Sequence, residues 1–348
     1  MRDIVVTVFL ALCIVLALRK PWYGVISLAV FSYLNPHAYA WSWATTIPAY
    51  FILFLVVVAA TIFARKEERQ ALPSDWRIPA FFALWFYFLI TTTQAYIQDA
   101  AWERLWTVSK IYLPFIFTLI LINTREKLYF LIATIAASIG LVAVKGGLFA
   151  ILSGFSYRVY GPPATQFYEN NAFAIATLIA IPLVLLVQQE TKVRWIRLAT
   201  MMALPLMFAS AISSWSRGAL LTLGVLIVMI LWHSKRKWLV APFMACSIAV
   251  GITMLPEQWF GRMQTLESYS EDESAKGRLE VWADGWNHTV HERPLVGAGF
   301  EGWRWVTQRD WHSSYIEMLS EHGFIAFGIW ISLILGTLRS LTSLIWQT

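Results

Sequence analysis

Four cationic side chains stand apart from the basic loops of the chain: Lys145, Arg158, Arg217 and Arg278. Lys145 and Arg217 lie within or at the start of apolar runs, where ionisable groups are costly and therefore candidates for function. Guanidinium and ammonium groups bind phosphate oxygens well. We expect the four to bind a multiply charged anion. Each alone is equally consistent with a pair to a loop carboxylate or to a lipid headgroup.

Polar residues precede three apolar runs at the ends where these cations lie. Asn and Ser are preferred helix N-caps, and a helix amino terminus attracts anions through its free N–H groups and dipole. The ordinary interpretation of each residue is a simple cap. Together with the arginines, they predict a pocket for a lipid-linked diphosphate. The residues are Asn170, Asn171, Ser213, Ser214, Ser216, Ser313 and Ser314.

His312 is the candidate general base. It stands in RDWHSSYIEML, where a long polar segment meets the last apolar run. A neutral imidazole accepts a proton near pH 7, as a sugar transfer to a hydroxyl requires. A lone histidine at such a junction is more often only a hydrogen-bonding side chain. Weaker candidates for the same task are Glu301, Asp310 and Glu317.

A metal site is the alternative chemistry. His288 and His291 lie three residues apart in NHTVHERP and share a face of a predicted helix, next to Glu292. The sequence has no HExxH motif and no pair of aspartates one residue apart. It also has no Walker loop, GxSxG elbow or dinucleotide fingerprint. We expect no metal and no cofactor, so cations must neutralise the diphosphate.

The elements that must position these residues are membrane helices. Of the 348 residues, 58% are hydrophobic and 14% charged, whereas a soluble domain has about 25% charged residues. This composition excludes a soluble globular enzyme, a disordered chain and a disulfide-rich secreted module. Cys13 and Cys246 lie in apolar runs and are predicted to be buried thiols. Apolar runs predict spans at 4–18, 23–41, 47–64, 78–97, 107–123, 128–152, 171–187, 198–212, 217–232, 239–255 and 321–338.

Most lysines and arginines fall in alternate loops, which the positive-inside rule assigns to the cytoplasm. The other face then carries segment 256–313, which has more acidic than basic residues and six tryptophans. We therefore expect a transmembrane bundle over 1–255, a periplasmic loop region over 256–313 and a C-terminal transmembrane helix over 314–348. The end of the chain resembles the start of another helix, so we expect truncation. Membrane topology explains the positions of most basic residues, so no nucleic-acid partner is expected.

Several motifs resemble the O-antigen ligase and O-antigen polymerase superfamily: SWSRGALL, AKGRLEVWADGW, RPLVGAGF and HSSYIEMLSEHGFIAFGIW. The segments GPPATQFYENNAFA and LNPHAYAW are similar to a subgroup, the O-glycosylation ligases associated with exosortase systems. The resemblance spans most of the chain. It includes the order and spacing of the motifs and the membrane topology.

The resemblance implies an all-α polytopic protein of the bacterial inner membrane, with about 11–12 transmembrane helices and one large periplasmic loop, similar to GT-C glycosyltransferases. It also implies transfer of a glycan from undecaprenyl diphosphate to an acceptor hydroxyl, without metal and with inversion. By motif position, Arg217 and Arg278 contact the diphosphate and His312 activates the acceptor. Lys145 and Arg158 are added from their charge and location. The acceptor is left open among lipid A-core, protein and polysaccharide.

Four other functions are the alternatives. A polymerase that extends glycan chains differs only in its products. A flippase or transporter of the lipid-linked donor would place charged groups at mid-membrane, whereas here they lie at the outer rim. A zinc hydrolase would use His288 and His291. A non-enzymatic scaffold would leave the outward cations unexplained.

Overall fold

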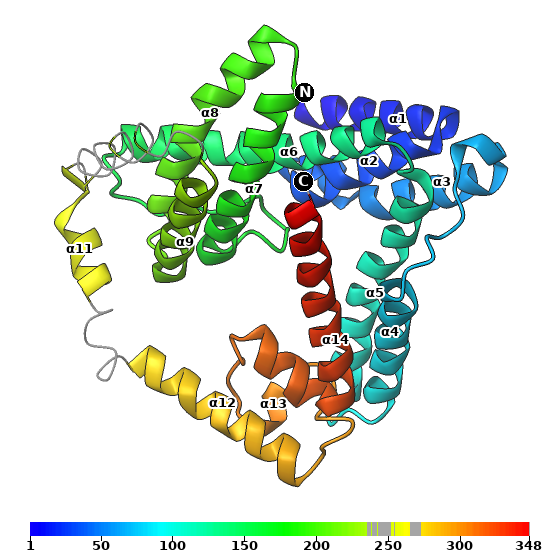
Figure 1. Ribbon diagram of the computed structural model, residues 1–348, viewed down its shortest axis with the longest axis vertical. Helices are drawn as coiled ribbons and strands as arrows, with labels where there is room; N and C mark the ends of the chain where they lie inside the picture. The colour runs from blue at the N-terminus through cyan, green and yellow to red at the C-terminus, as the bar shows by residue number, and fades with distance from the viewer. Residues whose placement is uncertain (235–237, 239–241, 243–251, 254, 265–272, 348) are drawn as a thin grey trace. The chain divides into compact units, whose positions relative to one another are not determined.

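The computed structural model describes residues 1–234, 238, 242, 252–253, 255–264 and 273–347 of the chain (Figure 1). Every regular element of these residues is a helix, and no strand occurs among them. Cys13 is a buried free thiol, as predicted. The predicted tenth span over 239–255, with Cys246, lies largely outside the described residues.

The chain divides into two compact units, each described by itself. Unit 1 comprises Met1–Gln70 and Ile120–Glu267, and unit 2 comprises Ala71–Leu119 and Ser268–Thr348. The helices of unit 1 are α1 (Arg2–Arg19), α2 (Pro21–Tyr33), α3 (Ala49–Phe63), α6 (Arg125–Leu152), α7 (Asn170–Glu190), α8 (Arg194–Ile212), α9 (Arg217–His233) and α11 (Glu257–Gln264), with short 3₁₀ turns η1 (Pro36–Tyr39), η2 (Trp43–Thr46) and η3 (Lys66–Glu68). Unit 2 holds α4 (Arg77–Thr93), α12 (Glu273–His291), α13 (Trp303–Val306), α14 (Ser314–Gln347) and most of α5 (Gln98–Leu121).

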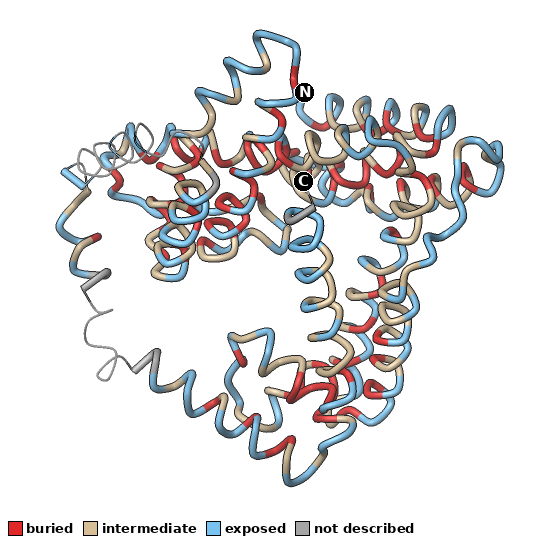
Figure 2. The backbone as a smooth tube through the Cα atoms, in the orientation of Figure 1, coloured by how far each residue is buried: buried red, intermediate tan, exposed pale blue. Residues whose placement is uncertain are grey.

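The core of unit 1 lies where α6, α7 and α8 pack together. Figure 2 shows buried residues concentrated along these helices. Phe173 and Ile181 of α7 and Met207 of α8 are almost completely buried there. The contact between α6 and α8 is close because Gly147 has no side chain, and a Cβ there would overlap the carbonyl group of Leu206. Small residues allow this backbone approach, as they commonly do between membrane helices.

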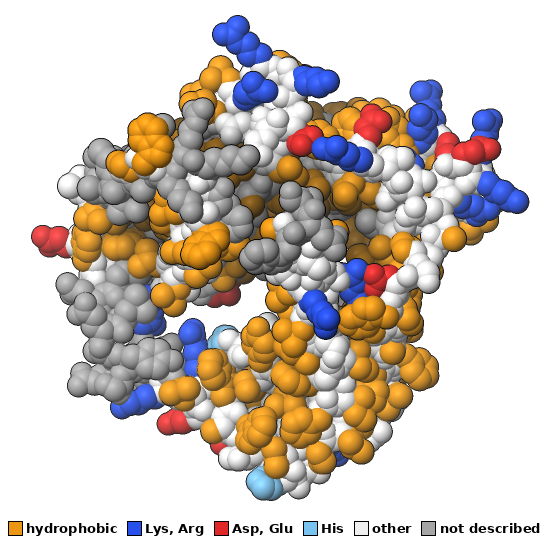
Figure 3. Space-filling view, in the orientation of Figure 1, with side chains coloured by type: hydrophobic (Ala, Val, Ile, Leu, Met, Phe, Trp, Pro, Cys, Tyr) orange, Lys and Arg blue, Asp and Glu red, His pale blue; other side chains and the backbone are white. Residues whose placement is uncertain are grey.

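Five helices of the described chain are long and apolar enough to cross a membrane: α5, α6, α7, α8 and Ser314–Ile345 of α14. Their outer surfaces expose large hydrophobic side chains, among them Phe115, Leu141, Ile179 and Leu335. Figure 3 shows such side chains over much of unit 2. Contact of such surfaces with lipid costs no free energy, whereas their exposure to water is unfavourable. The chain is therefore an all-helical, multi-pass membrane protein.

Most predicted apolar runs are confirmed as helices, but the second is shorter than predicted. The expected span 23–41 is helical only to Tyr33. Asn35 then adopts a left-handed conformation, with φ 51°, and Pro36 starts a 3₁₀ turn. Proline disfavours helix at the residue before it, and this local effect overrides the continuing hydropathy. The last apolar run begins earlier than predicted, at Ser314, and is interrupted at Gly323.

Several of the basic loops assigned to one side of the membrane meet at one end of unit 1. Arg125 forms an ion pair with Glu190 at 3.1 Å, which joins the start of α6 to the end of α7. Lys127 lies within electrostatic range of Lys20 and Glu68, which belong to two other loops. This clustering confirms that these loops share one end of the helices, as the pattern of charges predicted.

Candidate functional site

The opposite end of unit 1 is closed by two loops, residues 153–169 after α6 and residues 213–216 before α9. Backbone and side-chain hydrogen bonds join them: Val159 N donates to Ser213 O at 3.0 Å, and Ser213 Oγ donates to Tyr157 O at 2.8 Å. Trp215 Nε1 donates to Phe155 O at 3.1 Å. The ends of α6 and α8 are therefore held together, and the start of α9 with them.

The predicted caps fill different roles at this end. Ser216 is the N-cap of α9, and its Oγ accepts from Ala219 N at 3.1 Å, as predicted. Asn170 is not a cap: it is the first residue of α7, and its buried amide donates to Ser214 O at 2.7 Å. This bond fixes the serine turn directly before Arg217.

Three of the predicted cations lie at this end of unit 1. The Arg158 guanidinium lies 5.8 Å from the ring of Trp215, which precedes Arg217 by two residues. Arg158 is exposed and Arg217 is half-buried at the start of α9. Lys145 is exposed on α6, with Nζ 5.9 Å from the ring of Tyr39. Arg158 and Arg217 therefore belong to one loop cluster, whereas Lys145 lies about two turns before the end of α6, beside η1.

The two segments that resemble the exosortase-associated subgroup contact each other in unit 1. Asn35 Nδ2 donates to Pro163 O at 3.0 Å and lies 3.3 Å from Ala164 O. The rings of Tyr33 and Phe167 stack with centroids 5.8 Å apart. The left-handed Asn35 therefore anchors the GPPATQF loop. Motifs that are 128 residues apart in the chain form one structural element.

In unit 2, His312 lies at the junction before α14 in a left-handed conformation, with φ 48°. Its side chain is exposed, and its backbone N donates to Asp310 Oδ1 at 3.2 Å. The preceding residue, Trp311, is completely buried. The polypeptide is thus fixed on one side of His312 while the imidazole is open to a ligand.

Arg278 lies one helical turn from the group that holds this junction. It is exposed on α12, four residues before Trp282, so the two share a face. Trp282 Nε1 donates to Trp311 O at 2.7 Å. Arg309 adds a further guanidinium, because its Nη1 would lie 3.3 Å from a Cβ on Gly277. Unit 2 therefore brings Arg278 and His312 to the same part of the fold.

Two of the three carboxylates named as weaker bases, Glu301 and Glu317, lie beside cations, and the third, Asp310, accepts from His312 N. Glu301 Oε2 accepts from Arg304 Nε and from Trp303 Nε1, both at 3.1 Å. Arg104 lies 3.9 Å from Glu301 and 4.0 Å from Glu317. Arg104 was not predicted, although it met the criterion of a cation outside the basic loops. A carboxylate that accepts from a guanidinium, as Glu301 does, is a poorer proton acceptor than an exposed imidazole.

The zinc alternative finds no ligand set in the described part of the chain. His288 is buried, and its Nε2 lies 3.1 Å from Tyr96 Oη and 3.5 Å from Glu292. Burial lowers the pKa of His288 below its ordinary value, partly offset by Glu292. His291 is exposed. No group of three potential ligands occurs among these residues.

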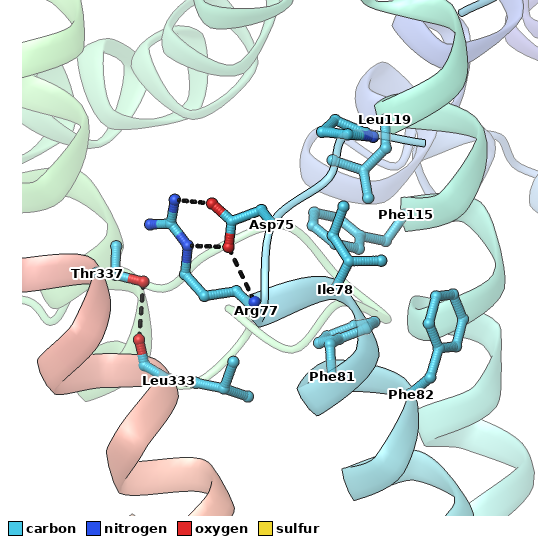
Figure 4. A pocket seen from close by; sticks show the side chains of 10 residues that line it. Asp75, Arg77, Ile78, Phe81, Phe82, Phe115, Leu119, Leu333 and Thr337 are labelled. Carbon is cyan, nitrogen blue, oxygen red and sulfur yellow. Dashed lines mark hydrogen bonds and ion pairs between the residues drawn. The ribbon is translucent and has the colours of Figure 1, made fainter. Parts of the chain in front are cut away.

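A pocket of about 440 Å³ in unit 2 is lined by none of the five predicted residues. Figure 4 shows Phe81, Phe82 and Phe115 on one side of it and the Asp75–Arg77 pair on the other. Arg77 hydrogen-bonds both carboxylate oxygens and lowers the pKa of Asp75 to about 2. Its cation is already neutralised, so this pocket is not the candidate site.

Lys145, Arg158 and Arg217 thus belong to unit 1, and Arg278 and His312 to unit 2. The comparisons with known families divide the chain between two families. Residues 1–192 match a family of unknown function, DUF5935. Residues 202–331 match the O-antigen ligase family, and this part contains the predicted arginines of both motifs and the histidine.

No curated protein and no solved structure matches the chain. The O-antigen ligase match indicates a ligase- or polymerase-type glycosyl transfer, with a lipid-linked glycan donor and a glycan acceptor in general terms. The chain therefore belongs to the DUF5935 family, and its O-antigen ligase domain at residues 202–331 supports its place in the O-antigen ligase superfamily.

Proposed function

We propose that the protein is a glycan ligase of the bacterial inner membrane. It transfers a glycan from undecaprenyl diphosphate to an acceptor hydroxyl at the periplasmic face, with inversion. The observation that carries the proposal lies in unit 2, where Trp282, one helical turn from Arg278 on α12, binds the carbonyl directly before the exposed His312. Arg278 and His312 both fall within the O-antigen ligase match. An imidazole beside a cation supplies a base and an anion contact together.

The reaction requires one bond to form and one to break. The acceptor oxygen attacks the anomeric carbon of the donor sugar while His312 takes the hydroxyl proton. The bond from that carbon to the diphosphate breaks, and undecaprenyl diphosphate leaves with the electron pair. Cations placed at the leaving group stabilise the charge that develops on it.

We propose Arg217, Arg158 and Lys145 as further contacts of the diphosphate. The position of Arg158 and Arg217 at the capped start of α9 supports this role for both, and Lys145 is included for its charge and its exposure on α6. The free N–H groups at that helix start add to the attraction for an anion. Because these groups carry the neutralisation, the proposed reaction needs no metal, which an assay with chelator tests.

The acceptor is proposed from the subgroup resemblance. The contact between Asn35 and the 161–167 loop shows that both subgroup motifs belong to one element of unit 1. A serine or threonine hydroxyl on a protein is therefore the first acceptor to test. Lipid A-core and polysaccharide hydroxyls are the others.

The experiment uses the purified full chain in liposomes, with undecaprenyl-diphosphate-linked glycan isolated from the cells that make the protein. Release of undecaprenyl diphosphate and transfer to each acceptor are measured with and without EDTA. We expect transfer in both conditions and a loss of about 10²-fold or more in His312→Ala, with donor binding retained. Transfer by His312→Ala at the wild-type rate would contradict the assigned base. Products with many repeats on a glycan acceptor would indicate a polymerase instead.

A further inference from the structure

Trp311 is the most firmly held side chain beside the candidate base. It is fully buried, and a Cβ on Gly285 of α12 would lie 2.6 Å from its ring. Its indole Nε1 donates to Glu321 Oε1 on α14 at 3.2 Å, while its own carbonyl accepts from Trp282 Nε1. The residue is therefore fixed at the ring, the indole nitrogen and the backbone.

Glu321 is itself held in place. It is 2% exposed, and its backbone carbonyl accepts from Gly299 N at 2.8 Å. A buried carboxyl group is costly unless it is hydrogen-bonded, so its contact with the Trp311 indole is a built feature of the core. Glu321 lies two residues before the break in α14 at Gly323.

These contacts constrain the backbone of His312, the next residue in the chain. His312 has a left-handed backbone, which is strained for a residue other than glycine and persists only where neighbours enforce it. Trp282 acts from α12 and Glu321 from α14, so together they fix the carbonyl that directly precedes His312. Arg278 shares the face of α12 with Trp282.

We infer that Trp282, Trp311 and Glu321 are positioning residues that hold His312 against the face of α12 that carries Arg278. This inference rests on the proposed function for its activity assay. The three residues touch no reacting atom. They set the direction of the imidazole, and a misplacement of about 1 Å in such a group costs up to about 10²-fold in rate.

The test compares substitutions that remove single hydrogen bonds. Trp282→Phe keeps the ring and removes the donor to Trp311. Glu321→Leu removes the acceptor, and Glu321→Gln retains an oxygen that accepts from the indole. The matched control is Trp85→Phe, which removes a 2.9 Å indole bond to a serine on α5 in the same unit.

Initial rates of undecaprenyl diphosphate release, from the donor used above, give kcat and KM. We expect Trp282→Phe and Glu321→Leu to lower kcat about 10- to 100-fold, with KM changed less than about twofold. Glu321→Gln and Trp85→Phe should stay near wild type. In a His312→Ala background, Trp282→Phe should cause no further loss, because it acts through the missing imidazole.

Hydrogen–deuterium exchange supplies a readout that needs no activity. Trp282→Phe should raise exchange at residues 307–313 and leave the rest of unit 2 protected. The inference is overturned by wild-type kcat in Trp282→Phe, by an equal loss in Trp85→Phe, or by an undiminished loss in the His312→Ala background. Activity of His312→Ala alone would instead refute the proposed base. Unchanged exchange at 307–313 refutes the positioning role whatever the substrate.

Discussion

Gly323 divides α14 in a conformation that is essentially restricted to glycine, with φ 72° and ψ −176°. A Cβ at this position would overlap the carbonyl group of Leu295. Backbone hydrogen bonds on both sides of the break join the segments 294–298 and 320–324. Phe324 N donates to Pro294 O at 2.9 Å, and Ala298 N donates to Ser320 O at 2.8 Å. Substitution by alanine therefore strains the backbone at residue 323 and displaces the backbone of Leu295.

The size of the effect follows from both costs. Backbone strain of this kind costs about 1–3 kcal/mol, and overpacking against a fixed neighbour costs about 1–3 kcal/mol more. We expect Gly323→Ala to lower the free energy of unfolding by about 2–6 kcal/mol. Gly328→Ala is the matched control on the same helix, because a Cβ there meets no atom within 4 Å. In a helix interior that change gains about 0.5–1 kcal/mol.

Thermal unfolding of the purified proteins in detergent, followed by tryptophan fluorescence, measures the difference. The Gly323→Ala protein should melt several degrees below wild type, and Gly328→Ala should melt at or above it. Equal melting temperatures for the two variants would refute the backbone requirement at Gly323.

Three further predictions concern separate features. Arg217→Ala should reduce kcat/KM for the lipid-linked donor about 10- to 100-fold, whereas Arg125→Ala, at the other end of unit 1, should not; equal donor kinetics would remove Arg217 from the site. Asn170→Ala should lower the free energy of unfolding by about 1–3 kcal/mol because it leaves a buried carbonyl unpaired, while Asn171→Ala, whose amide contact is exposed, should cost less; chemical denaturation distinguishes them. The lowered pKa of His288 means that the unfolded chain binds its proton more readily, so stability is full above pH 6.5 and falls as the pH drops toward the folded-state pKa. His288→Gln should flatten this dependence in melting curves between about pH 7 and 5, and an unchanged slope would show that another group titrates.

Much of the helical framework could be predicted because each apolar run is bounded by a clear signal. The run 128–152 became α6, Arg125–Leu152, whose start is capped by Thr124, and Ser216 marks the start of α9. Hydropathy failed where local backbone chemistry opposed it. Pro36 ends the second helical segment although the residues beyond it stay apolar.

The charged residues of the candidate site could be predicted from the sequence. The residues that hold them in position could not. Residue type and topology alone identify cations that lie outside the basic loops. They also identify a histidine where a polar segment meets an apolar run. The bond from Trp282 to the Trp311 carbonyl joins residues 29 apart through the packing of α12. No periodicity identifies the partner of an indole N–H, because that partner is chosen by the tertiary fold.

We propose that Arg278 and His312 serve one transfer, with Arg278 at the diphosphate and His312 at the acceptor hydroxyl. Cysteines at their neighbours, Gly277→Cys and Ser313→Cys, leave both groups intact. The native thiols, Cys13 and Cys246, are replaced by alanine.

A short bismaleimide added to membranes that contain this pair measures the proximity of the two groups directly. We expect efficient cross-linking of Gly277→Cys to Ser313→Cys, because a Cβ on Gly277 would lie 3.3 Å from Arg309 Nη1, and none for a control pair of Ser313→Cys with Leu338→Cys, near the far end of α14. If both cysteines of the first pair react with monofunctional maleimide yet never cross-link to each other, with or without donor, the two groups do not share a substrate.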